Sequence, residues 1–110
     1  MDLWTPSSID PAPQRPVVLH SEDGAARIVA INLPADDEMQ EHQVHEHAWL
    51  HVHSGTVEVV ADGATERVTA GSIVHWDPGE RHAVRGVEDA LLVLMLAPWP
   101  GPGHPNLRND

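Results

Sequence analysis

Short apolar and β-branched runs, separated by turn residues at fairly even spacing, constrain the fold of this 110-residue chain more than any other feature. Such spacing is typical of β-sandwiches and β-barrels, and no segment carries a convincing helical period. Asp62-Gly63, between two alternating runs, is the strongest hairpin signal. We expect strands at residues 16–20, 26–33, 47–53, 56–61, 65–69, 72–76, 82–86 and 90–96.

Proline-rich ends frame these runs. Residues 1–16 contain prolines among polar residues and are expected to form an extended arm, because X-Pro steps disfavour helix. Residues 98–110, rich in proline and glycine, are expected to form an irregular tail. The sequence therefore predicts one all-β domain over residues 17–97. Within it, the acidic stretch 34–46 has no strand character and is expected to be a loop that enters a strand.

Composition excludes several classes of function. The net charge of −11, with 17 acidic residues against six basic ones, argues against partners that are nucleic acids or anionic membranes. Cysteine is absent, which excludes disulfides, thiolate catalysis and cysteine-ligated metals. The chain has no apolar run long enough to span a membrane and no secretory signal pattern, so we expect a cytoplasmic protein.

Histidine is strongly over-represented, with nine in the chain. Neutral imidazole is a general base and a ligand for iron, nickel, copper and zinc. Residues two apart in a strand share a face, so several of these histidines could line one side of a strand together with Trp49. Scattered surface imidazoles are the alternative for an acidic protein without lysine. Five of the nine lie in the segment 42–53, and a sixth follows a turn: His42, His45, His47, His51, His53 and His82.

The turn before His82 resembles a motif of the cupin superfamily, whose members are small double-stranded β-barrels, or jelly rolls. The motif Gly-x5-Pro-x-Gly-x2-His is matched by Gly71, Gly79 and His82, with Asp77 in place of the proline. The resemblance implies an antiparallel double-stranded β-helix, or jelly-roll barrel, and a metal ligand at His82. The glycines serve tight turns.

A second cupin motif, Gly-x5-His-x-His-x3-Glu-x6-Gly, fits only in part. Counted back from Gly55, it places His42 at the first histidine, Val44 at the second and Ala48 at the glutamate. The segments 41–46 and 96–101 are also similar to those of small bacterial cupins. The resemblance covers roughly residues 25–97.

A competing register takes His45, His47 and His51 as the ligand set, with a histidine in place of the glutamate. It shortens the strand before the next turn, so the register through His42 is preferred for positioning, while His45 could still supply a second ligand. The expected metal is divalent iron, nickel, copper, zinc or manganese. The candidate ligands are His82, His42, His45, His47 and His51, and the candidate pocket residues are Trp49, Trp76 and Arg85.

Three functions are compatible with these residues. The first is a metal-binding cupin that acts on a small organic molecule, with dioxygenase-like chemistry as the first expectation. The second is a non-catalytic cupin that binds or senses a small ligand, supported if Ala48 faces the pocket beside fewer than three convergent imidazoles. The third is a metal-free isomerase or epimerase that uses one histidine as a base. A homodimer is expected in each case, because the arm and the apolar run 90–96 offer surface that a small monomer covers poorly.

Overall fold

Two long strands, β4 and β7, organise the computed structural model, which describes residues 1–13 and 15–105. All pairings between the named strands are antiparallel. The described part contains no helix, and therefore none that could cross a membrane. The strands are β1 (Val17–Glu22), β2 (Ala25–Leu33), β3 (Glu38–His42), β4 (His47–Ala61), β5 (Ala64–Thr69), β6 (Ile73–Trp76) and β7 (His82–Trp99).

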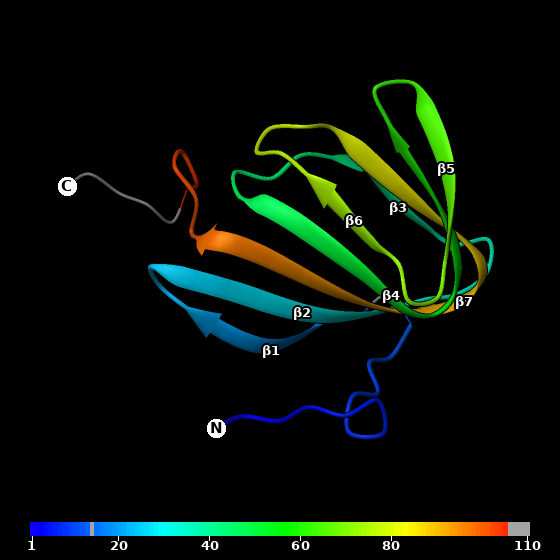
Figure 1. Ribbon diagram of the computed structural model, residues 1–110, viewed down its shortest axis with the longest axis horizontal. Helices are drawn as coiled ribbons and strands as arrows, with labels where there is room; N and C mark the ends of the chain where they lie inside the picture. The colour runs from blue at the N-terminus through cyan, green and yellow to red at the C-terminus, as the bar shows by residue number, and fades with distance from the viewer. Residues whose placement is uncertain (14, 106–110) are drawn as a thin grey trace.

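Strands β4 and β7 each run through both halves of the barrel (Figure 1). The first half of β4 lies between β6 and the end of β7, and β2 and β1 continue that sheet. The second half of β4 lies between β5 and the start of β7, and β3 closes that sheet on the other side. The chain therefore forms two antiparallel sheets that share two strands, which is the jelly-roll arrangement the sequence predicted.

Gly55 marks the place where β4 passes from one sheet to the other. The register between β4 and β7 shifts on both sides of this residue, and its φ is +81°. A Cβ at Gly55 would lie 2.1 Å from the carbonyl oxygen of Asp89, so only glycine fits there.

The core lies between the two sheets and is built from alternate residues of each strand. In the first half of β4, even-numbered residues are buried and odd-numbered ones are partly exposed. Across from them, Leu92 and Leu96 of β7 are buried as well. This alternation decides which histidines face the interior. The largest fully buried apolar side chains are Leu33, Leu50, Leu92, Val52, Val57 and Val84.

The strand boundaries differ from the sequence expectation in three places. Residues 47–53 and 56–61 form one strand, and so do 82–86 and 90–96, because the glycines taken as breaks sit at bends within continuous ladders. β7 also continues to Trp99, past the expected strand end at residue 96. The expected loop 34–46 contains β3, an edge strand that alternation could not reveal because Met39 is its only apolar residue.

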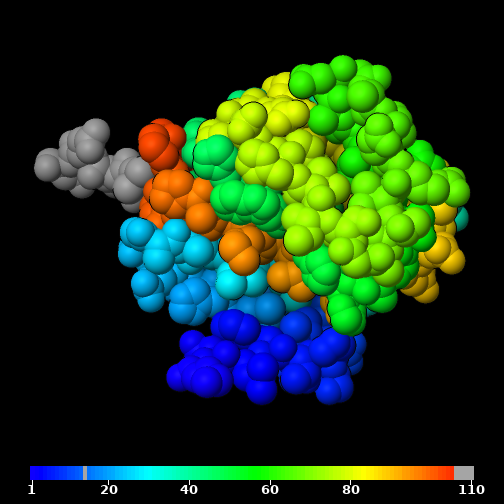
Figure 2. Space-filling view, in the orientation of Figure 1, coloured from blue at the N-terminus to red at the C-terminus, as the bar shows by residue number. Residues whose placement is uncertain are grey.

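The N-terminal arm lies along one side of the barrel (Figure 2). Asn32 of β2 holds it there: the Asn32 side-chain amide donates to the carbonyl oxygen of Pro11 at 3.2 Å, and Pro13 forms a bridge with Asn32. Pro11 is buried under this contact. The arm is therefore anchored to the sheet although it forms no strand.

Candidate metal and ligand sites

His42 and His82, here called the inner pair, are brought together by the pairing of β3 with β7. They are direct register partners at the end of one strand and the start of the other. Their rings meet edge to face, with centroids 4.4 Å apart. Trp76, at the end of β6, stacks on His82 with centroids 3.9 Å apart and planes 7° from parallel. His82 and Trp76 each keep only 3% of their surface exposed.

Backbone carbonyls fix both rings of the inner pair. Nδ1 of His42 lies 2.8 Å from the carbonyl oxygen of Gln40, and Nδ1 of His82 lies 3.1 Å from that of Glu80. A carbonyl can only accept, so each Nδ1 carries the hydrogen and donates it. Metal-binding histidines are oriented in the same way by their second nitrogen. Nε2 is therefore the atom that each ring can offer to a ligand.

The surroundings of His82 favour its neutral form. Burial lowers the pKa of His82 below its ordinary value, and the neighbouring His42 lowers it further. The hydrogen bond to the Glu80 carbonyl and the charge of Glu80 act in the opposite direction without reversing the shift. A neutral imidazole with Nδ1 protonated has its lone pair on Nε2, which is the form that binds a metal or accepts a proton.

The two other motif positions carry no ligand. Ala48 is buried and lies opposite Trp76 in the β4–β6 ladder, so it faces the side of the sheet where His82 lies. Val44 is partly buried and packs against the core. Among the described residues, the inner pair does not belong to any group of three or more potential ligands. The inner pair thus stands beside apolar side chains where the family motif has a histidine and a glutamate.

The histidines of β4 lie on the opposite face of the strand from Ala48. His47 stacks on Trp49 with ring centroids 5.7 Å apart, and both rings pack against His75 of β6 at 5.2 Å. His51 lies further along the same face, and its ring is 6.2 Å from that of His53. The outward alternation of β4 therefore separates His47, Trp49 and His51 from the inner pair.

His47, His75 and Asp77 form a second cluster, here called the outer group. Nδ1 of His47 lies 2.9 Å from Nε2 of His75. One carboxylate oxygen of Asp77 lies 3.8 Å from the first nitrogen and 3.9 Å from the second. These three ligand atoms are close enough to hold one metal ion. His75 and Asp77 were not predicted as ligands, although residues two apart in an extended segment share a face.

The remaining candidates lie elsewhere. His45 is exposed, and its ring meets that of His104 edge to face at 5.6 Å. Next to it, the buried Glu46 accepts a hydrogen bond from the backbone N–H of Gly101 at 2.7 Å, which ties the start of β4 to the C-terminal segment. Arg85 points outward, where its guanidinium donates to Glu58 at 3.2 Å and lies 3.7 Å from Asp36.

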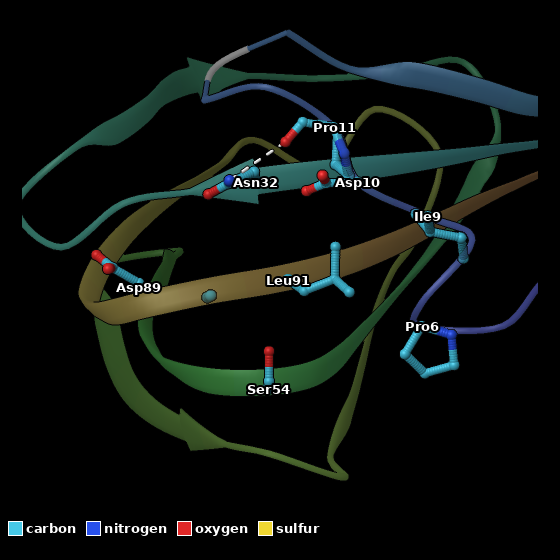
Figure 3. Close-up of a pocket in the computed structure, with 9 residues that line it drawn as sticks. Pro6, Ile9, Asp10, Pro11, Asn32, Ser54, Asp89 and Leu91 are labelled. Atoms are coloured by element: carbon cyan, nitrogen blue, oxygen red, sulfur yellow. Dashed lines mark hydrogen bonds between the residues drawn. The ribbon is translucent and has the colours of Figure 1, made fainter.

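Two cavities lie away from the inner pair. One, of about 290 Å³, lies between the arm and the barrel, where Asp10 and Pro11 face Asn32, Ser54 and Leu91 (Figure 3). The other, of about 410 Å³, lies between β5 and β6 and includes His75. Neither cavity is lined by His42 or His82.

The fold and the histidines define the class of this protein: a single jelly-roll barrel with an imidazole pair inside. Residues 20–97 match the cupin domain family, so the chain belongs to the cupins. A search of the curated proteins finds no match.

Solved structures support the same fold. A conserved protein of unknown function from Streptococcus pyogenes is 21% identical, with 94% of this chain and 90% of that chain covered and a TM-score of 0.75. A cupin domain from Schizosaccharomyces pombe is 17% identical (84% and 72% covered, TM-score 0.74). An RmlC-like cupin with a double-stranded β-helix fold from Methanocaldococcus jannaschii is 18% identical (84% and 88% covered, TM-score 0.70). At these identities the likeness concerns the fold alone.

Proposed function

We propose that this cupin holds a divalent transition metal with His42 and His82 and presents it to a small organic molecule. The observation that carries the proposal is the contact between two imidazoles whose Nδ1 atoms are both engaged by backbone carbonyls, which leaves two Nε2 atoms for one ion. Imidazole suits iron, nickel, copper and zinc, whereas manganese prefers carboxylate, which the inner pair does not offer.

Each residue around the inner pair has a separate role in this proposal. His42 and His82 hold the ion, and the carbonyls of Gln40 and Glu80 keep their rings turned toward it. Trp76 walls the site and excludes water from one face of His82. A metal bound there supplies Lewis-acid or redox chemistry, the dioxygenase kind included, at the coordination positions that two protein ligands leave open.

Metal analysis of protein purified without chelators tests this proposal. We expect bound metal in the wild type and a loss of one ion per chain in His82→Gln and in His42→Ala, because each variant removes one of the two ligands of the inner pair. His53→Ala, which removes an exposed imidazole outside both groups, serves as the matched control. Circular dichroism verifies that each variant folds. Metal content that does not fall in either inner-pair variant contradicts the proposal.

A second candidate function is the binding of a small organic molecule without metal. Ala48 and Val44 favour it, because they make the surroundings of the inner pair apolar where the family motif has ligands. In this case the Nε2 atoms of His82 and His42 accept hydrogen bonds from the ligand, and Trp76 provides a stacking surface. Ligand binding that survives complete removal of metal by a chelator supports this function over the first.

A homodimer belongs to the same proposal. The N-terminal arm exposes the large apolar side chains of Met1, Leu3 and Trp4. Apolar residues gathered on one exposed segment are typical of an interface between protein chains. Light scattering on the purified full-length chain distinguishes a dimer from a monomer.

A further inference from the structure

We propose that the outer group, His47, His75 and Asp77, is a second site for a divalent transition metal. It lies on the outer surface of the barrel, with one ligand from β4, one from β6 and one from the turn that follows β6. Nothing in the cupin motifs points to it, since none of these three residues is a motif ligand in the register through His42.

The spacing of the three ligand atoms fits one ion. The atoms are separated by 2.9, 3.8 and 3.9 Å. In a tetrahedral site with metal–ligand bonds of about 2.0–2.2 Å, ligand atoms lie roughly 3.3–3.6 Å apart. The observed separations lie on both sides of this range. Side-chain rotations that move these atoms by a few tenths of an ångström therefore bring all three to bonding distance.

The local packing holds the outer group in place before any ion binds. The rings of His47 and His75 are stacked, 19° from parallel, and Trp49 packs against both. The turn that carries Asp77 is fixed by a hydrogen bond from its backbone N–H to the Glu80 carboxylate at 3.0 Å. Ligands on paired strands, with rings locked by stacking, lose little conformational freedom when they bind a metal.

The chemistry of the ligands selects the ion. Two imidazoles and one carboxylate suit zinc, copper, nickel and ferrous iron, whereas magnesium and calcium prefer oxygen ligands. In the absence of metal, one hydrogen lies between the two imidazole nitrogens, since one must donate and the other accept. Metal binding moves that hydrogen to the other nitrogen of its ring, so that imidazole changes its tautomer and keeps its charge. The net charge of −11 adds a general attraction for cations.

The outer group and the inner pair can be occupied independently. His47 and His75 alternate with Ala48 and Trp76 along the same two strands, so they lie on the opposite face of the sheet from the residues beside the inner pair. Water completes the coordination of an ion at the outer group, because His75 and Asp77 are exposed.

Isothermal titration calorimetry with Zn²⁺ on the full-length, metal-stripped protein tests the inference. We expect His75→Ala to weaken one Zn²⁺ site by more than about 100-fold, because even partners outside the ligand set change metal affinity 10- to 100-fold. Asp77→Asn weakens the same site, while His82→Gln leaves it unchanged. His53→Ala is the matched control, since it removes an exposed imidazole of β4 that does not belong to the outer group.

Tryptophan fluorescence gives a second readout, because Trp49 packs directly on two of the three ligands. In the His82→Gln background, which removes the inner-pair ligand that stacks on Trp76, Zn²⁺ still changes the emission. The change is lost when Trp49→Phe or His75→Ala is added to that background. The inference is overturned if His75→Ala and Asp77→Asn bind Zn²⁺ as the wild type does. It is equally overturned if His53→Ala loses as much affinity as they do, or if the wild type binds Zn²⁺ no tighter than about 1 mM, a binding free energy of about −4 kcal/mol.

Discussion

The inner pair and the outer group use the same side chain in opposite surroundings, although they lie on adjoining strands. The inner pair has two imidazoles, a stacked indole and a buried alanine. The outer group has two imidazoles, a carboxylate and solvent. A partly buried imidazole pair whose ligands include no carboxylate suits neutral ligands or a weakly charged complex, whereas an exposed set with a carboxylate ligand suits a hydrated cation. The direction of each side chain on β4 and β6 produces this difference.

The variant with the largest expected effect is Ala48→Glu, which restores the carboxylate of the family motif beside the inner pair. Without metal we expect a loss of about 3–5 kcal/mol in the free energy of unfolding, because an unpaired charge is then buried beside Trp76. With Zn²⁺ added, the variant recovers more stability than the wild type gains, since the new carboxylate and the inner pair share the ion. Urea unfolding followed by tryptophan fluorescence measures both effects.

The control for this prediction is Ala64→Glu, which adds the same side chain at an exposed position of β5. We expect it to change the free energy of unfolding by no more than about 0.5 kcal/mol. A small effect of Ala48→Glu, comparable to that of the control, would show that Ala48 does not face the interior.

The alternation of β4 itself is tested by two neighbouring truncations. Leu50→Ala removes a side chain that is 1% exposed and is expected to cost about 2–5 kcal/mol. His51→Ala removes a neighbour on the opposite face, and we expect a change within about 0.5 kcal/mol. Similar costs for both variants, measured by urea unfolding, would contradict the alternation of β4.

Variants of Glu46 test how the start of β4 is fixed to the C-terminal segment. Glu46→Ala leaves the backbone N–H of Gly101 without its acceptor, and we expect a loss of about 1–3 kcal/mol. Glu46→Gln keeps an oxygen acceptor of the same length and recovers most of that loss. Thermal unfolding monitored by circular dichroism compares the two variants, and equal losses in both would rule out the hydrogen bond as the cause.

The smallest expected effect is the pH dependence of the inner pair. Because the pKa of His82 is lowered by burial, the unfolded chain takes up a proton on this residue before the folded protein does. The stability that His82 contributes is therefore fully present above the unfolded pKa of about 6.5 and is lost as the pH falls toward the lowered value. We expect the wild type to lose more stability than His82→Gln when the pH falls from about 7 to about 5.

Two neighbouring groups also act on the pKa of His82. His42 on β3 and Glu80 in the preceding turn both act on the charge of His82. In His42→Gln the pKa of His82 is lowered less, because the neighbouring imidazole no longer acts on it, so the pH profile of stability should be flatter than that of the wild type. A wild-type profile identical to that of His82→Gln would mean that His82 is not held in its neutral form.

Much of the fold follows from local sequence signals. Asp62 and Gly63 both have positive φ, and they connect β4 to β5 in the hairpin that the sequence predicted. The spacing of Gly71, Gly79 and His82 led to the cupin family, to which the chain belongs. These signals work because turn geometry depends on a few adjacent residues.

Local sequence signals could not predict which residues lie next to each histidine. Whether His47 faces inward or outward depends on the pairing register of β4, and a shift of one residue reverses every side chain of the strand. The outer group forms only because β6 pairs with β4 and places His75 opposite Trp49. β3 was missed because only Met39 supplies an apolar side chain to the core from that edge strand.

The sharing of β4 and β7 by both sheets has a consequence for how the chain assembles. Neither sheet can form until segments far apart in the sequence have paired, because His47 lies opposite Ala97 and Ala61 lies opposite His82. A topology dominated by such distant pairings folds slowly. It also leaves no half of the barrel able to persist alone, so we expect unfolding to be a single transition in which both histidine groups disperse together.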